Sequence, residues 1–276
     1  MPLNAQNGRV RLGKAVMEYA AFGQGEHTLV LLPGLGDGLK NVAGMAVPLA
    51  GMYHLLAQHF RVLVLSRKAP LSPGSTTRDM AEDVVQALAQ LGVQRASVVG
   101  VSMGGMIAQH LAIHHPDLVE KLVLTVTCPR PNPVMKASVG AWMDMARQGD
   151  MERLMVDNGR RLYSDGFLKR YGRLLPLVGK VYKPRSWQQF LIMSQACLAH
   201  DAWDGLPEIH APTLVIGGEQ DKTLGGEASR EIASRIPGSR LKMYPNYGHG
   251  VYEEAPDYQQ TVLDFLMEAD LYEKTT

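Results

Sequence analysis

The sequence predicts an α/β fold built on a mostly parallel central sheet. Short apolar runs alternate with longer amphipathic runs along most of the 276 residues, which is typical of consecutive βαβ units. Apolar residues make up 46% of the chain and charged residues 20%, which are ordinary values for a globular protein. A chain of this length forms one large domain, or a domain with a sizeable insertion, and it can bury a substantial core.

Strands are expected where the apolar and β-branched runs are short. The six clearest are Thr28–Leu32, Arg61–Ser66, Ser97–Val101, Lys121–Val126, Thr213–Gly217 and Arg240–Tyr244, and two weaker ones precede them near Gly8–Leu12 and Ala15–Phe22. The expected helices are Ala46–His59, Thr77–Leu91, Met103–His115, Glu227–Ile236 and Pro256–Ala269. Thr76 and Asp79 favour a capping box at the start of the second helix, and Leu91-Gly92 favours its end.

The alternation of strands and helices breaks between Pro129 and Gly205. This stretch contains several helical patterns and no convincing strand. It carries 12 Lys and Arg against 7 Asp and Glu, whereas the rest of the chain is net acidic. We therefore expect a helical insertion over one edge of the sheet, at residues 129–205, with residues 1–128 and 206–276 as the α/β core.

Large adaptable side chains are frequent in this insertion. They are Met135, Met143, Met145, Met151, Met155 and Met193, together with Trp142, Trp187 and Trp203. Methionine re-packs easily and would suit a pocket that accepts varied acyl or alcohol groups, although such residues more often fill a core. The positive excess would attract an anionic ester, and a solvated helical face explains it equally well.

Composition excludes several other classes of protein. The net charge of +1 indicates neither nucleic acid nor a membrane surface as a partner. The two cysteines have neither metal-ligand nor disulfide-framework spacing, and the histidines do not cluster. The first residues lack the apolar run of a signal peptide, and no apolar segment approaches the ~20 residues that span a bilayer. A cytoplasmic protein without a membrane span is expected; the sequence makes no prediction of its oligomeric state.

The most informative motif is Gly-x-Ser-x-Gly at residues 100–104, which follows an apolar strand and opens a helix. This context is what a nucleophile elbow requires. The strand must reverse into a helix within about two residues, which forces Ser102 into a sparsely populated backbone conformation. Gly100 and Gly104 keep Cβ atoms out of the crowded space on either side. The Met103 amide then lies at a helix N-terminus, where negative charge is stabilised.

Serine is a weak nucleophile that needs a histidine base and a carboxylate to orient the histidine. Asp221 follows one predicted strand and His249 follows another, and ligands bind at the ends of parallel strands. A solvated loop aspartate is the ordinary alternative for Asp221. The rival acids are Glu219 and, further behind, Asp204, and the one rival base is His200.

The glycine-rich run at residues 31–38 follows the strand Thr28–Leu32 directly. Its glycines allow the backbone to turn an amide toward the serine, so the second oxyanion donor, besides Met103, is assigned to Leu35. The run lacks the Lys-Ser/Thr of a Walker loop and the full Gly-x-Gly-x-x-Gly spacing, so it does not indicate a nucleotide site.

These four motifs, in this order, resemble the α/β-hydrolase superfamily over nearly the whole chain. They are Leu-Leu-Pro-Gly-Leu-Gly at 31–36, Gly-Val-Ser-Met-Gly-Gly at 100–105, Gly-Gly-Glu-Gln-Asp at 217–221 and Tyr-Gly-His-Gly at 247–250. The resemblance implies an eight-stranded, mostly parallel sheet flanked by helices, with residues 129–205 as a helical cap over the active site. It also implies the roles of the candidates: Ser102 nucleophile, His249 general base, Asp221 orienting acid, and the Leu35 and Met103 amides as oxyanion hole.

The chain departs from the superfamily pattern at two places. Pro33 stands where many members have a histidine, which is neither nucleophile nor base there, so catalysis is not put in doubt. Residues 65–70 replace the usual Asp-x-x-Gly-x-Gly-x-Ser loop. Two interpretations of this loop are open: Arg67 or Lys68 turned toward the pocket, or a solvated basic loop, which we favour.

The expected function is hydrolysis of a small-molecule carboxylic ester through a covalent acyl-enzyme, with no cofactor and no metal site. An alternative keeps the triad but uses it for C–C bond or lactone hydrolysis, perhydrolysis, cyanohydrin cleavage or acyl transfer. A third alternative is a non-catalytic receptor for a small molecule, against which the complete candidate triad argues.

Overall fold

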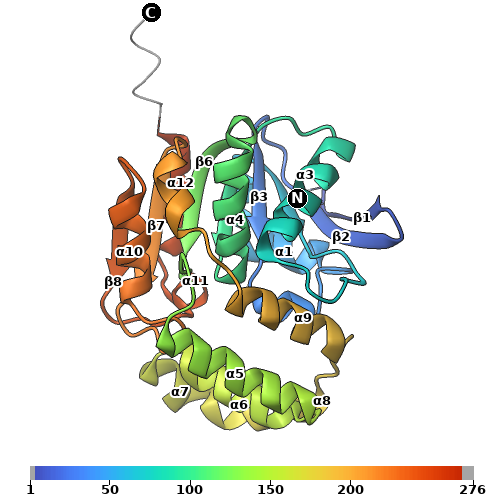
Figure 1. The fold of residues 1–276 in the computed structure, drawn as a ribbon, viewed down its shortest axis with the longest axis vertical. Helices are drawn as coiled ribbons and strands as arrows, with labels where there is room; N and C mark the ends of the chain where they lie inside the picture. Colours follow the sequence, from blue (N-terminus) through green and yellow to red (C-terminus); the bar gives the residue numbers. More distant parts are fainter. Residues whose placement is uncertain (1–3, 269–276) are drawn as a thin grey trace, which may run out of the picture.

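Eight strands form a single sheet in the computed structural model, which describes residues 4–268. The strands are β1 (Gln6–Leu12), β2 (Ala15–Phe22), β3 (Thr28–Leu32), β4 (Arg61–Leu65), β5 (Ala96–Val101), β6 (Val119–Thr125), β7 (Thr213–Gly218) and β8 (Arg240–Tyr244). Their order is β1-β2-β4-β3-β5-β6-β7-β8 (Figure 1). β2 pairs antiparallel with both β1 and β4, and the other pairs are parallel. The predicted eight-stranded, mostly parallel sheet is confirmed.

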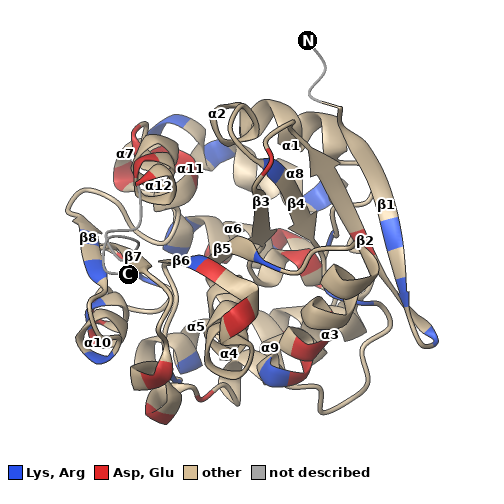
Figure 2. Cartoon of the chain, turned by 90° about the horizontal axis from the view of Figure 1, so that it is seen from above, with Lys and Arg blue, Asp and Glu red and all other residues tan. Residues whose placement is uncertain are grey.

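The central strands β3 and β5 are apolar apart from Thr28 and Ser97, because both faces of the sheet are covered. In β3, Leu29 and Leu31 join one buried cluster, and Val30 and Leu32 join the other. This alternation follows from the two-residue period of a strand. Neither β3 nor β5 contains a charged residue, and Figure 2 shows basic and acidic residues interspersed over the outer elements.

Helices on the two faces supply the other half of each cluster. One face is covered by α1 (Ala46–Met52), α2 (His54–Ala57), α11 (Val251–Glu254) and α12 (Tyr258–Met267). The opposite face is covered by α3 (Thr77–Gln90), α4 (Met103–His114) and α10 (Glu227–Arg235). Short 3₁₀ turns complete the core at η1 (Leu35–Gly38), η2 (Pro116–Leu118) and η4 (Trp203–Glu208).

Most of the predicted helices form within a few residues of their expected ends. The capping box of α3 is present, because Thr76 and Asp79 each accept the other's backbone amide, and Gly92 follows its end with φ +70°. The prediction of one helix over Ala46–His59 was wrong, because Tyr53 adopts φ −100° and ψ 29° and separates α1 from α2. The predicted end of the last helix, Ala269, lies outside the described residues.

Residues 129–205, all of which the structure describes, form helices and no strand. They are α5 (Pro133–Arg147), α6 (Met151–Leu162), α7 (Asp165–Tyr171), η3 (Gly172–Leu174), α8 (Leu175–Val181) and α9 (Trp187–Leu198). Figure 1 shows α5 to α8 gathered beyond one end of the sheet, with α9 between them and the sheet. We refer to residues 129–205 as the helical segment.

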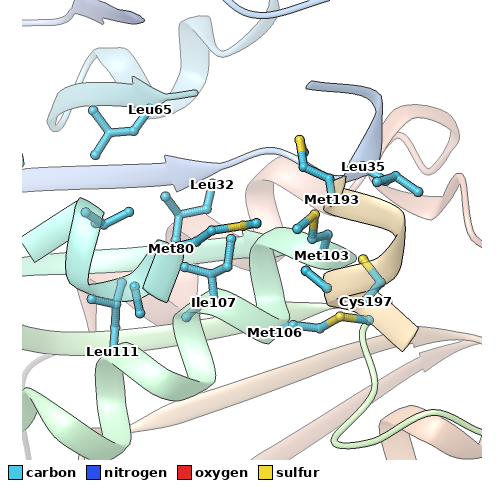
Figure 3. Packing of buried hydrophobic residues seen from close by; sticks show 14 of the residues in the cluster. Leu32, Leu35, Leu65, Met80, Met103, Met106, Ile107, Leu111, Met193 and Cys197 are labelled. Carbon is cyan, nitrogen blue, oxygen red and sulfur yellow. The ribbon is translucent and has the colours of Figure 1, made fainter. Parts of the chain in front are cut away.

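The methionines of the helical segment are mostly core residues. Met135, Met143, Met151 and Met193 are buried in the larger hydrophobic cluster, and Met145 packs against it. In Figure 3 Met103 and Met106 of α4 lie beside α9, which carries Met193 and Cys197. This packing holds α9 against the helix that begins at Ser102.

In the described part of the chain, no helix is both long and apolar enough to cross a bilayer.

Candidate active site

Ser102 occupies the sharp turn between β5 and α4. Its backbone has φ 53° and ψ −118°, the sparsely populated conformation expected of a serine at this turn. Its amide donates to the Thr125 carbonyl at 2.9 Å, which fixes the turn to β6. A Cβ at Gly104 would lie 1.9 Å from the Leu32 carbonyl oxygen, and one at Gly100 would lie 2.5 Å from that of Gly104. Both glycines are therefore required by close backbone packing.

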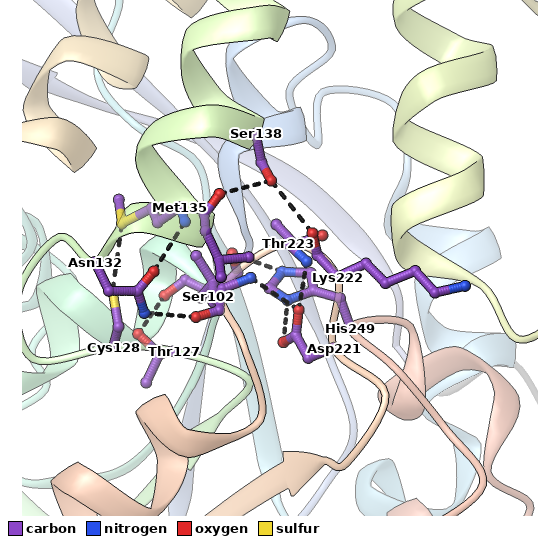
Figure 4. Close-up of polar contacts among 12 residues, drawn as sticks. Ser102, Thr127, Cys128, Asn132, Met135, Ser138, Asp221, Lys222, Thr223 and His249 are labelled. Carbon is purple, nitrogen blue, oxygen red and sulfur yellow. Dashed lines mark hydrogen bonds and ion pairs between the residues drawn. The ribbon is translucent and has the colours of Figure 1, made fainter.

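The loops after β7 and β8 bring an aspartate and a histidine to this serine (Figure 4). His249 Nε2 lies 3.0 Å from Ser102 Oγ, and His249 Nδ1 lies 2.7 Å from Asp221 Oδ2. The side chains of His249 and Asp221 are buried. A carboxylate only accepts hydrogen bonds, so Nδ1 carries the proton and Nε2 is free to accept from the serine hydroxyl.

The environment of Asp221 keeps it ionised. Burial alone raises the pKa of this carboxyl, but the adjacent His249 and hydrogen bonds from His249 and the Leu224 and Thr223 amides outweigh burial and lower the pKa. The two amides donate to Oδ1 at 2.7 Å for Thr223 and 2.9 Å for Leu224. Asp221 therefore remains an anion at neutral pH that can orient the imidazole and stabilise its protonated form.

The glycine-rich loop after β3 runs beside the serine. A Cβ at Gly34 would lie 3.4 Å from Ser102 Cβ. Leu35 is the first residue of η1 and Met103 is the first residue of α4, and amides in a first helical turn have no acceptor within their helix. η1 is held by α9, because a Cβ at Gly38 would lie 2.9 Å from Met193 Sδ. Both predicted oxyanion donors thus belong to turns that adjoin Ser102.

A family model described as "alpha/beta hydrolase fold" matches residues 27–256. The chain belongs to the α/β hydrolase fold family. One relative is "Putative carbamate hydrolase RutD" of Caulobacter sp. (strain K31); it is 28% identical, and the match covers 87% of this chain and 90% of the relative. Another is "2-hydroxy-6-oxononadienedioate/2-hydroxy-6-oxononatrienedioate hydrolase 2" of Pseudomonas putida; it is 27% identical, and the match covers 94% of this chain and 94% of the relative.

Solved structures show the same architecture. A hydrolase from Pseudomonas aeruginosa PA01 superposes with a TM-score of 0.79 at 27% identity, covering 96% of this chain and 99% of that one. The enol-lactonase from Burkholderia xenovorans LB400 gives a TM-score of 0.80 at 24% identity, covering 95% of this chain and 100% of that one. The likeness to the enol-lactonase shows the fold, and the family match together with the Pseudomonas aeruginosa hydrolase supports a hydrolase.

The other acids and the other base considered from the sequence of this α/β hydrolase do not contact Ser102. Glu219 accepts a hydrogen bond from Arg230, and Asp204 belongs to η4. His200 is buried with Nδ1 2.9 Å from Thr77 Oγ1. Of the acids and bases considered from the sequence, the structure therefore brings only Asp221 and His249 to Ser102.

The interpretation of residues 65–70 as a solvated basic loop was wrong. Arg67 is only 3% exposed, and its guanidinium donates to the Leu65 carbonyl at 3.2 Å and to the Pro33 carbonyl. Asp37, in the glycine-rich loop, accepts from Ser66 Oγ at 2.6 Å and from the Arg67 amide at 2.7 Å. Burial raises the pKa of Asp37, and the charge of Arg67 and these hydrogen bonds oppose that rise. The guanidinium therefore binds backbone carbonyls at the ends of β3 and β4, and its charge also acts on the buried Asp37 carboxylate.

This contact, which we call the Asp37–Arg67 brace, ties the glycine-rich loop to the end of β4. Sequence reasoning singled out Arg67 but not its partners. The available signal was one acid inside an apolar glycine-rich loop. Lys68 instead binds Asp83 at 2.7 Å and stays partly exposed.

Thr127 is a further residue that sequence reasoning missed. Its Oγ1 donates to the Ser102 carbonyl at 2.8 Å, and its side chain occupies the space beside Gly105. Asn132 caps α5 through the Met135 amide and also donates to the Leu224 carbonyl at 2.6 Å. No motif marks either residue, because both act through backbone groups of segments distant in sequence.

A pocket of about 400 Å³ opens onto Ser102 and His249. Its walls include the glycine-rich loop and, from the helical segment, Trp142, Leu154 and Met155. This volume lies near the lower end of the roughly 300–1,000 Å³ typical of small-molecule sites. Of the six methionines of the segment, Met155 lines the pocket.

Proposed function

We propose that this chain is a serine hydrolase that cleaves carboxylic esters through an acyl-enzyme on Ser102. The observation that carries the proposal is the connected series Ser102 Oγ, His249 and Asp221, with separations of 3.0 and 2.7 Å, at the wall of an apolar pocket. The strained backbone of Ser102 supports the same assignment, since such strain concentrates at functional sites.

In the proposed reaction Ser102 Oγ attacks the ester carbonyl while His249 Nε2 accepts the hydroxyl proton. The C–O bond to the alcohol breaks, and the alcohol leaves with the proton returned by His249. Water, deprotonated by the same histidine, attacks the acyl-enzyme, and the carboxylic acid departs as Ser102 regains its proton. The Leu35 and Met103 amides are proposed to stabilise the oxyanion in both halves.

The helical segment is proposed to act as a cap over the core formed by residues 1–128 and 206–276. Support comes from Trp142, Leu154 and Met155, which line the pocket from α5 and α6. The substrate is then a small ester whose access depends on the cap. The chemistry requires no cofactor, and a cytoplasmic location is part of the same proposal.

Covalent labelling tests this proposal. A fluorophosphonate probe is expected to label the wild-type chain, because the activated serine attacks phosphorus as it attacks a carbonyl. Ser102→Ala is expected to remain unlabelled, and Ser72→Ala, which alters an exposed serine, is expected to label like the wild type. Equal labelling of Ser102→Ala and the wild type would refute the assignment of the nucleophile.

C–C bond hydrolysis by the same triad is the second candidate. It is favoured by the Pseudomonas putida relative, whose name is that of an oxononadienedioate hydrolase. The choice of substrate distinguishes the two functions. An ester hydrolase is expected to show high kcat/KM on simple esters, whereas a C–C bond hydrolase is expected to show only trace ester turnover and strong activity on a vinylogous diketone. In both cases Ser102→Ala is expected to be inactive.

A further inference from the structure

The pocket beside Ser102 offers no cation to a substrate, in the part of the chain that the structure describes. Apart from His249, its charged lining residues are two acids, Asp37 and Glu253, and neither lysine nor arginine lines it. Arg67, which lies close by, is committed to the Pro33 and Leu65 carbonyls. The net positive charge of the helical segment is therefore not directed into the pocket.

The remaining polar lining adds no positive charge. Tyr163 donates to Glu253 at 2.6 Å, and burial together with the charge of Glu253 raises the pKa of Tyr53 to about 12. Both phenols are therefore neutral at physiological pH. A substrate carboxylate in this pocket would meet two acids and neutral hydroxyls.

One part of the pocket extends below the strand ends, between the sheet and the helices α1, α2 and α12. We call it the rear arm and define it by Leu31, Val64 and Val99 of the sheet and Leu49, Leu56 and Val262 of the helices. The side chains of these three strand residues are 3–5% exposed. Leu29 and Val62, the preceding residues on the same face of β3 and β4, are fully buried. The rear arm thus ends within about two residues of Val99, and its six defining side chains are apolar. The same helices and their junction also contribute Tyr53 and Tyr258 to the pocket lining.

The order of the strands decides which half of an ester this arm receives. The leaving alcohol must lie beside His249 Nε2, which returns its proton. His249 and Asp221 follow β8 and β7, on one side of β5 in the sheet order. Leu31 and Val64 lie on β3 and β4, on the other side. An alcohol beside His249 would therefore leave the acyl group on the side of β5 where the strand residues of the rear arm lie.

We propose that the rear arm binds the unbranched, uncharged acyl chain of the ester, and that this makes the enzyme selective for neutral medium-chain acyl esters. This inference rests on the proposed ester hydrolysis. Val99 precedes Ser102 by three residues, about 10 Å at ~3.3 Å per residue, which fits an acyl chain of roughly six to eight carbons. A charged chain is disfavoured because an unpaired carboxylate loses its hydration there.

The acyl preference is tested with two matched series of esters. In the first, p-nitrophenyl acetate, butyrate, hexanoate and octanoate vary the acyl chain; in the second, ethyl, butyl and hexyl acetate vary the alcohol. Each buried methylene is expected to raise kcat/KM about fourfold in the first series. The second series is expected to change less than threefold in total. A flat first series, or an equally steep second one, would overturn the assignment of the arm.

A pair of variants on α1 locates the effect. Leu49 lines the rear arm, whereas Val47 on the same helix is 71% exposed. Leu49→Trp is expected to lower the hexanoate-to-acetate ratio of kcat/KM at least tenfold, because the larger side chain fills the space of the longer acyl chain. Val47→Trp, the matched control, is expected to leave the ratio unchanged. An unchanged ratio in a folded, acetate-active Leu49→Trp would contradict the proposal.

The charge preference is tested with mono-p-nitrophenyl adipate, which has the length of the hexanoate and a terminal carboxylate. Its kcat/KM is expected to be at least 100-fold below that of the hexanoate, and comparable turnover of the two would refute the neutral-chain assignment. Fluorophosphonate labelling distinguishes failure of the acyl-chain preference from failure of the proposed ester hydrolysis. A labelled Ser102 with a preference for adipate leaves ester hydrolysis standing, whereas absent labelling and absent ester turnover remove its basis.

Discussion

The loops at the strand ends and the helical segment meet at one pocket, but they are constrained very differently. Around Ser102 the backbone is packed so closely that a Cβ at Gly104 would lie 1.9 Å from another residue's carbonyl oxygen. In the helical segment, Gly140 of α5 has open space around it. α8 also leaves large apolar side chains in solvent, with Leu177 59% and Val181 71% exposed. The comparison indicates that the reacting groups are rigidly positioned, whereas the exposed faces of α5 and α8 tolerate change. The helical segment is closely packed where its own helices meet, as at Gly179, where a Cβ would lie 2.6 Å from Glu152 Cα.

The largest effect is expected from Asp221→Asn, which removes the charge that orients His249. A neutral amide favours the wrong imidazole tautomer, so kcat is expected to fall about 10⁴-fold. Steady-state kinetics on p-nitrophenyl hexanoate measure this. Glu219→Gln alters the neighbouring acid, which binds Arg230 instead, and is expected to retain activity. Comparable losses in both variants would contradict the assignment of Asp221.

The Asp37–Arg67 brace provides the second test of the strand-end region. Arg67→Met leaves the buried Asp37 carboxylate without its cation and the Pro33 carbonyl without a donor. The free energy of unfolding is expected to fall by about 1–3 kcal/mol, because buried polar groups lose a partner, and kcat is expected to fall more than KM rises because the glycine-rich loop loses its anchor. Denaturant unfolding and steady-state kinetics measure the two effects.

The matched control for this variant is Arg185→Met, which removes an exposed arginine that binds Asn41. It is expected to change both stability and kcat little. An Arg67→Met variant as stable and active as Arg185→Met would show that the brace does not support the loop.

Two glycine substitutions compare the regions directly. Gly104→Ala is expected to destabilise the fold by about 3 kcal/mol, because the new methyl group overlaps the Leu32 carbonyl. Gly140→Ala is expected to stabilise it by about 0.5–1 kcal/mol, because alanine loses less entropy in a helix. Thermal unfolding of both variants measures the signs. The same sign in both would contradict the contrast in packing.

A smaller effect concerns His200, at the end of the helical segment. Burial and the nearby His110 lower the pKa of His200 to about 3, from about 6.5 in an unfolded chain. Its neutral form therefore contributes stability that is fully present above pH 6.5 and is lost as the pH falls toward 3. Between pH 7 and 5, His200→Gln is expected to lose about 1–2 kcal/mol less stability than the wild type.

Denaturant unfolding at the two pH values measures this difference. His54→Gln, which replaces an exposed histidine on α2, serves as the control and is expected to follow the wild type. An identical pH dependence in His200→Gln and the wild type would show that His200 is not held neutral by its burial.

The sequence predicted the features that depend on local pattern. The eight strands, the capping box at Thr76 and the positions of Ser102, Asp221 and His249 at strand ends follow from periodicity and turn chemistry. The features it did not predict depend on contacts between distant segments. The Arg67 amide donates to Asp37, 30 positions away, and the Arg67 guanidinium donates to the Pro33 carbonyl, 34 positions away. Neither contact leaves a periodic signal along the chain.

The shape of the pocket was equally beyond local pattern. The rear arm is formed by single residues from β3, β4 and β5 together with α1, α2 and α12. The positive excess of the helical segment suggested an anionic substrate, but none of its lysines or arginines lines the pocket. Net charge along a segment therefore gave no guide to the charge that a substrate meets.

Direct detection of an acyl-enzyme tests the central claim, that Ser102 carries the reaction. The chain is mixed with p-nitrophenyl hexanoate, quenched in acid within the first turnovers and analysed by peptide mass spectrometry. A hexanoyl increment is expected on the peptide that contains Ser102, and none is expected in Ser102→Ala. Turnover by Ser102→Ala at the wild-type rate, or a hexanoyl group on another residue that accounts for turnover, would contradict the account.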